Sequence, residues 1–136
     1  ERQMDTILAL ELPAMLPHIV INATANERAR LSNLSTNFDS SWKFQFEGVQ
    51  GQHYDVYADP KDRVVALQLF TPDVLDVLYS LLPTTDVEVS GSKIWFIQRY
   101  GILGEQQARS LFMAVEQIEL ELRKQVHSAR LENVHA

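Results

Sequence analysis

The sequence predicts an α+β fold, a mainly antiparallel sheet of about four or five strands with helices packed on it and a long C-terminal helix. Two segments alternate apolar and polar residues on either side of Gly48 and Gly51, as the strands of a hairpin do. Thr71-Pro72-Asp73 is a strong start signal for a helix. Apolar residues then recur at helical spacing from about Glu105 onward.

The composition is that of one folded domain, and it excludes several functional classes. The chain has 136 residues, 46% of them hydrophobic and 22% charged, so we expect residues 1–136 to form a single globular domain. It contains no Cys, which excludes thiol catalysis, disulfides and thiolate metal sites. Its 12 Lys and Arg residues are scattered and its net charge is −6, so we expect no nucleic-acid binding. No run of about 20 apolar residues is present, so a membrane would be reached only through segments outside this chain.

The first residues, 1–13, predict a helix. They are strong helix formers, with Met4, Ile7 and Leu8 at helical spacing. Pro13 should end this helix, because proline removes a backbone donor. We expect that the helix could continue from a membrane anchor upstream of Glu1.

A strand and a loop follow. His18–Ala23 is a short β-branched run, too brief for a helix, and predicts a buried strand. The polar segment 24–41 predicts a loop that is held by its few large apolar residues, Leu31, Leu34 and Phe38.

The first hairpin is predicted by the period of two in Trp42–Glu47 and in His53–Ala58. Gly48 and Gly51 can adopt the positive φ of a tight turn between these strands. Asp59-Pro60 should end the second strand, because proline cannot donate to the ladder.

Two short helices are expected next. Residues 61–70 fit either a helix or a strand, and we favour the helix. A helix should begin at Pro72, capped by Thr71, and end before Pro83. Its apolar face, expected to pack on the sheet, is Val74, Leu75, Val77, Leu78, Leu81 and Leu82.

A second hairpin is predicted from Asp86–Val89, a turn at Ser90-Gly91-Ser92 and a return over Ile94–Ile97. The returning strand is apolar on both faces. It should therefore be central in the sheet, or have the side that carries Trp95 covered by a helix.

The long C-terminal helix should pack through one apolar seam, with Glu119 four residues before Arg123 as a supporting ion pair. The seam consists of Leu111, Val115, Ile118, Leu122 and Val126. Met113 and Leu120 lie off this seam, so a second apolar strip could bind a protein partner or a second copy of the chain. The alternative is a helix that only covers the sheet. Residues 128–136 lose apolar density and should fray.

Candidate chemistry is concentrated on the polar face of the first hairpin. His53, Asp55 and Tyr57 could oppose Lys43, Gln45 and Glu47, and a histidine beside two carboxylates can act as a base or bind a metal. Any half-exposed strand also shows polar residues on its outer face, so we assign no catalytic residue. We expect no metal and no cofactor.

A ligand-binding cleft is the other candidate site. Aromatic residues could surround it, namely Trp42, Tyr57, Trp95 and Tyr100. The residues that we expect to contact a ligand, if one binds, are His53, Asp55, Tyr57 and Trp95.

The stretch from His18 to Phe96 resembles an uncharacterised bacterial family. The resemblance rests on the His18–Ala23 strand, the Leu31–Leu34 loop, Phe46-Glu47-Gly48, Tyr54–Ala58, Ala66-Leu67, Phe70–Asp73 and Asp86–Val89. It departs from the family at Val49–Gln52, where the family tends to place an acidic and an aromatic residue. That family is similar to domain-of-unknown-function proteins in which a soluble domain follows N-terminal membrane helices, and it supplies no catalytic residue.

These observations favour a non-enzymatic interaction or regulatory module of a membrane-associated bacterial protein. The resemblance implies a membrane-anchored context, and we expect the domain on the cytoplasmic side. A small-molecule or peptide-binding domain is the alternative, and an enzyme that depends on a metal or on histidine is a third reading.

Overall fold

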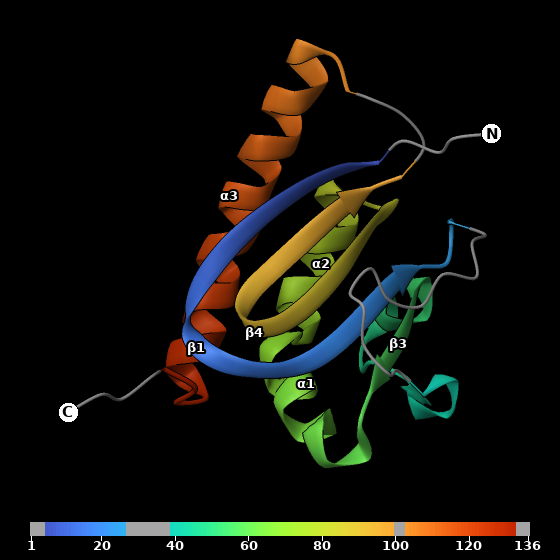
Figure 1. Ribbon diagram of the computed structural model, residues 1–136, viewed down its shortest axis with the longest axis vertical. Helices are drawn as coiled ribbons and strands as arrows, with labels where there is room; N and C mark the ends of the chain where they lie inside the picture. Colours follow the sequence, from blue (N-terminus) through green and yellow to red (C-terminus); the bar gives the residue numbers. More distant parts are fainter. Residues whose placement is uncertain (1–4, 27–38, 100–102, 133–136) are drawn as a thin grey trace.

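The computed structural model describes residues 5–26, 39–99 and 103–132 of the chain. Four antiparallel strands form one sheet in the order β2-β3-β1-β4. Figure 1 shows the three α-helices together on one face of this sheet, with α3 the longest of them. The predicted α+β class is therefore confirmed. Leu31, Leu34, Phe38 and Tyr100 lie outside the described residues.

Strand β1, Thr6–Ala23, replaces the helix that we expected over the first residues. That prediction was wrong from Thr6 onward. Leu8, Leu10 and Leu12 alternate with outward residues, and the burial pattern of this half of the strand has the same period of two. Pairing with β4 overrides the helix propensity, which amounts to less than about 1 kcal/mol per residue. The second half of β1 contains the predicted His18–Ala23 strand, which is confirmed.

Strand β4, Thr85–Gln98, doubles back on itself. A straight strand of 14 residues would be about 48 Å long. The hydroxyl of Thr85 nevertheless donates to Oε1 of Gln98 at 2.9 Å, so the two ends of β4 meet. Gly91, with φ of +63°, lies at the reversal. The predicted change of direction at Ser90-Gly91-Ser92 is therefore present.

β1 bends around β4 and pairs with both of its arms (Figure 1). The first half of β1 runs beside the second arm of β4, with Thr6 opposite Gln98 and Glu11 opposite Lys93. The register shifts twice between Glu11 and Ile19, and the second half of β1 then pairs with the first arm of β4. The apolar returning arm is thus enclosed by β1.

The first hairpin forms with shorter strands than we predicted. β2, Lys43–Phe44, pairs with β3, Tyr54–Ala58. Between them the chain forms a 3₁₀ turn, η2, Val49–His53. Gly48 adopts φ of +89°, as the turn prediction requires. Gly51 is needed for space, because a Cβ atom there would lie 2.5 Å from the carbonyl oxygen of Phe46.

Both short helices form, and the second begins at the predicted cap. A 3₁₀ turn, η3, Pro60–Asp62, leads into α1, Arg63–Leu69, so the helical alternative for this segment is confirmed. α2, Pro72–Leu81, is capped by the hydroxyl of Thr71, which accepts from the backbone N–H of Val74 at 3.4 Å. A third 3₁₀ turn, η1, Ser40–Trp42, precedes β2.

Helix α3, Glu105–Ser128, covers the sheet through the predicted seam. All five seam residues are buried: Leu111, Val115, Ile118, Leu122 and Val126. The predicted pair is also formed, with Nε of Arg123 donating to Glu119 at 2.8 Å. Beyond the helix, where we expected fraying, Leu131 packs against the core and Glu132 bridges to Ala14.

Candidate functional site

His53 is turned toward the helices and not toward the polar face of the hairpin. It is the last residue of η2, and its ring stacks on Tyr79 of α2 with 3.9 Å between centroids and 8° between planes. The same tyrosine meets the ring of Tyr54 edge to face at 6.4 Å. His53 therefore belongs to an aromatic contact between η2 and α2.

Asp55 and Tyr57 lie on the same face of β3, two residues apart. Asp55 is ion-paired with Lys43 of β2 at 3.2 Å, and both groups are well exposed. The hydrogen bond and charge of Asp55 raise the pKa of Lys43 above its ordinary value. The amide of Gln45 is directed elsewhere, since it donates to the carbonyl of Gly51 at 2.8 Å.

Trp95 is placed on another part of the sheet. It lies opposite Ala9, on the arm of β4 that pairs with the first half of β1, whereas β3 pairs with the second half. Of the four predicted ligand contacts, the structure brings Asp55 and Tyr57 together and places His53 and Trp95 apart from them.

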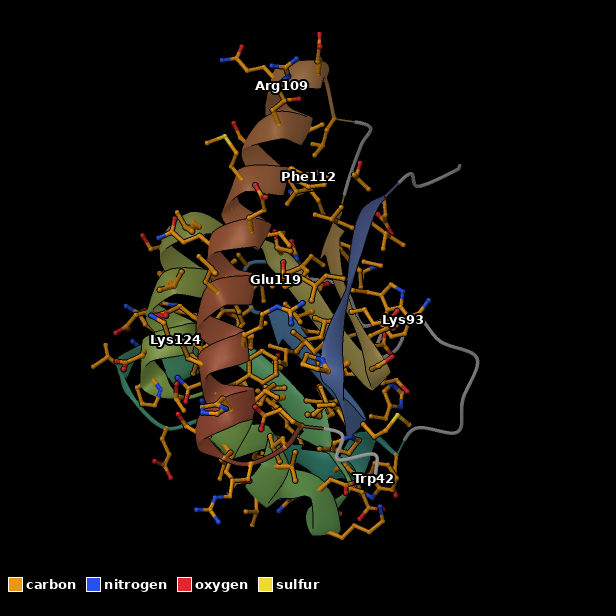
Figure 2. All side chains as sticks on the ribbon, turned by 90° about the vertical axis from the view of Figure 1, so that its left-hand side faces the viewer. Trp42, Lys93, Arg109, Phe112, Glu119 and Lys124 are labelled. Carbon is orange, nitrogen blue, oxygen red and sulfur yellow. The ribbon has the colours of Figure 1, made fainter. Side chains whose placement is uncertain are left out.

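A groove of about 610 Å³ lies where β1 bends, beside η1 and η3. Its lining residues are Met15, Leu16, Pro17, His18, Trp42, Asp59, Lys61, Asp62 and Val65. Figure 2 shows Trp42 at this end of the molecule. The polar members contact one another or the protein: Asp59 accepts from the N–H of Lys61 at 3.1 Å, and Nζ of Lys61 lies 3.0 Å from Asp62. Of the predicted aromatic residues, Trp42 is the one that lines this groove.

His18 lines the groove and pairs with a buried carboxylate. Its Nε2 lies 2.5 Å from the carboxylate of Glu88, which is 1% exposed. A buried carboxylate that orients an imidazole is an arrangement found in acid–base sites. Among the described residues that line the groove there is no Ser, Thr or Cys. Within the described part of the chain, the pair thus places a hydrogen-bonded imidazole and carboxylate beside the groove.

A second buried ionic cluster ties the ends of β1 and β4 together. Arg99, 4% exposed, donates from Nε to Asp86 at 2.7 Å and from Nη1 to Asp5 at 3.1 Å. The other oxygen of Asp86 accepts from the backbone N–H of Ala23 at 2.8 Å. Asp5 and Ala23 lie at opposite ends of β1, and Asp86 and Arg99 at opposite ends of β4.

Neither cluster was predicted, although Asp86 and Glu88 lie in the predicted hairpin. They alternate with Val87 and Val89, a pattern typical of a strand with one solvated face. Both carboxylates are buried instead, 3% and 1% exposed, because each has a cationic or imidazole partner from a distant segment. Only the partner's position in space reveals this.

Large apolar side chains are exposed on α3 and on the first half of β1. The exposed fractions are 56% for Phe112, 69% for Met113, 64% for Leu120 and 53% for Ile7. Met113 and Leu120 are seven residues apart and so lie on one face of the helix. Figure 2 shows Phe112 on the side of α3 where β1 runs. α3 and the first half of β1 thus carry large apolar side chains at the surface.

Among residues 5–26, 39–99 and 103–132 there is no cluster of three or more His, Asp or Glu side chains that could hold a metal ion. Over the same residues no single helix has the length and apolarity to cross a bilayer, although the bent pair of Pro60–Leu69 and Pro72–Leu81 satisfies both criteria jointly. Compared with protein-family models, curated proteins and solved structures, the chain matches none of them.

Proposed function

We propose that this chain is a non-enzymatic interaction module of a membrane-associated bacterial protein. The observation that carries the proposal is the row of exposed apolar side chains on α3, Met113 and Leu120, together with Phe112 and Ile7 at its flank. Exposing such side chains to water is unfavourable, and burying one contributes about 1.5–3 kcal/mol. Large apolar side chains exposed on one helix face are typical of a contact surface.

The charged groups fit this function better than catalysis. Asp86, Glu88 and Arg99 are buried in pairs that hold strands together, and Asp55 is paired with Lys43 at the surface. His53 is stacked on Tyr79. Each of these groups thus has a structural role, which leaves the apolar surface as the feature without one.

The membrane-associated bacterial context rests on the resemblance of His18–Phe96 to proteins in which a soluble domain follows membrane helices. Fractionation of the cells that produce the protein tests this part. We expect the native protein in the membrane fraction, released by detergent and not by salt. Recovery in the soluble fraction would contradict it.

Photo-crosslinking in those cells tests the interaction surface. A photoreactive amino acid at Leu120 or Met113 should give a discrete adduct, whereas the same residue at Asp76, an exposed position on α2, should not. Met113→Lys with Leu120→Lys should prevent complex formation and leave the unfolding midpoint within a few degrees of wild type, because both side chains are already exposed. Equal labelling at all positions would refute an interaction surface on α3.

Ligand binding is the second candidate function, and the groove beside Trp42 favours it. Asp59 and one aromatic ring, Trp42, suit a positively charged group that lies over the indole, where it would compete with Lys61 for the carboxylate of Asp62. Trp95→Phe leaves Trp42 as the sole tryptophan, because the chain has 2. Lysine- or arginine-containing tripeptides should then change its fluorescence in a saturable way, and a flat titration would exclude this candidate.

A further inference from the structure

We propose that the open edge of β1, Thr6–Glu11, joins two copies of this chain by antiparallel pairing centred on Ala9. The inference rests on the proposed function, since it names one partner of the interaction module. It differs from an association through α3 alone, because the contact is made by backbone hydrogen bonds of the sheet.

Among the described residues, no strand lies along the outer side of this edge, although Arg123 of α3 bonds to the carbonyl oxygen of Glu11. The Thr6–Glu11 half of β1 pairs with β4 on one side, and β3 pairs only with Ile19–Ala23. Within the parts of the chain that the structure describes, no strand pairs with the other side of Thr6–Glu11. Figure 1 shows this half of β1 at the margin of the sheet. An unprotected edge of this kind is a template for another strand.

One hydrogen bond shows which backbone groups point outward. Nη2 of Arg123 donates to the carbonyl oxygen of Glu11 at 3.2 Å, so the backbone of Glu11 is directed away from β4. In an antiparallel strand the outward direction alternates from residue to residue. Ile7 and Ala9 therefore also present their N–H and C=O groups at the edge, whereas Leu8 and Leu10 direct theirs to β4.

The outward backbone groups and the acidic side chains together favour one register for the pairing of two copies. About a two-fold axis at Ala9, each Ala9 faces the other and Ile7 faces Glu11, and all of these residues have outward backbone groups. The two Glu11 side chains are then four residues apart along the strands, or about 14 Å, beyond the Debye length at physiological salt. A two-fold axis at Leu8 would instead set Asp5 opposite Glu11, two acidic residues. The pairing centred on Ala9 avoids that repulsion.

The side chains beside the edge are apolar and incompletely covered. Leu8 and Leu10 face the helices but remain half-buried, whereas Leu12 is 2% exposed. In the register centred on Ala9, Leu8 faces Leu10 of the second copy on that side of the sheet. Pairing would therefore complete the burial of both leucines.

Phe112 extends this apolar surface. It lies three turns before Arg123 on the same side of α3, a distance of about 16 Å, which equals about five residues of strand from Glu11 back to Thr6. Phe112 is thus near the first residues of the edge. Because the edge is only six residues long, we expect a weak dimer with a dissociation constant in the micromolar range.

Single cysteines test the register directly, because the chain contains no Cys. Across a two-fold axis at Ala9 the two Cα atoms should be about 5.5 Å apart, within the range that a disulfide spans. Under mild oxidation Ala9→Cys should form covalent dimers at least tenfold faster than Ile7→Cys or Glu11→Cys. An equimolar mixture of Ile7→Cys and Glu11→Cys should couple as fast as Ala9→Cys. Equal rates for the three single variants would overturn the proposal.

Ala9→Pro separates association from folding. Its ring removes an N–H that points away from β4, so the monomer should fold with an unchanged unfolding midpoint while sedimentation equilibrium shows the loss of the dimer. A wild-type chain that stays monomeric at several hundred micromolar would also refute the inference. If Ala9→Cys gives no dimer but the photo-crosslinks at Leu120 persist, the edge inference fails and the interaction module stands. If neither gives an adduct, both fail.

Discussion

Arg99 is a cation that is 4% exposed and holds two carboxylates, Asp86 and Asp5. Replacing it by methionine keeps most of its volume but leaves Asp86 buried without its ionic partner. Removing one member of a buried pair costs about 3–5 kcal/mol. We therefore expect Arg99→Met to lower the free energy of unfolding in urea by about this amount.

The control for Arg99→Met is Lys61→Met, since Lys61 pairs with Asp62 at the surface. Exposed ion pairs contribute little, so this variant should unfold at the wild-type urea midpoint. Equal effects of the two substitutions would mean that the buried cluster does not hold the strand ends together.

Tyr54 has a buried hydroxyl group. Its side chain is 1% exposed, and within the described residues its hydroxyl has no hydrogen-bond partner. An unsatisfied buried polar group costs about 1–3 kcal/mol. Tyr54→Phe should therefore raise the free energy of unfolding by about 1 kcal/mol. A loss of stability of that size would show that the hydroxyl does make a bond.

The same residue predicts a pH dependence. Burial, and secondarily the charge of Tyr79, raises the pKa of Tyr54 in the folded protein, so its phenol stays neutral there. The unfolded chain can ionise this phenol above about pH 10. The free energy of unfolding is therefore unaffected by this phenol below about pH 10 and falls as the pH rises above it, because only the unfolded chain loses the proton. Wild type should lose stability more steeply than Tyr54→Phe between about pH 10 and 11.5, and parallel slopes would contradict the shift.

At the scale of elements, α3 separates a packing face from an exposed face. Leu122 is 0% exposed in the seam, while Leu120, two residues earlier, is 64% exposed. Leu122→Ala removes buried methyl groups and should lower the free energy of unfolding by about 2–5 kcal/mol. Leu120→Ala should change it by less than about 0.5 kcal/mol. Chemical denaturation of both variants checks the orientation of the helix, and similar losses would mean that α3 is turned about its axis.

The elements whose signals are local were predicted correctly. Thr71 caps α2, Asp59-Pro60 ends β3, and Gly48 and Gly91 adopt positive φ, since each of these depends on a few neighbouring residues. The first strand was mistaken for a helix because its residues have good helix propensity. The residues that make it a strand, Lys93 to Gln98, follow more than 80 positions later in the chain.

At the scale of the whole molecule, the residue pairs that form the candidate sites could not be predicted from the sequence. Arg99 and Asp5 are 94 residues apart, and His18 and Glu88 are 70 apart. Such pairs follow only once β1 is known to bend around β4. The predicted ligand contacts failed to converge for the same reason, because His53 turned to α2 and Trp95 lies on a different arm of the sheet from Asp55. The apolar strip at Met113 and Leu120 needed only helical spacing, and both residues are exposed as that spacing indicated.

The central claim is that the first half of β1 is a strand with one paired edge and one open edge. Amide hydrogen exchange, followed by NMR in protein too dilute to associate, tests it residue by residue. The amides of Leu8 and Leu10 should be protected by their bonds to β4, and those of Ile7 and Ala9 should exchange nearly as fast as in an unfolded chain. Uniform protection from Ile7 to Glu11, as a helix would give, or the absence of any alternation, would contradict the claim.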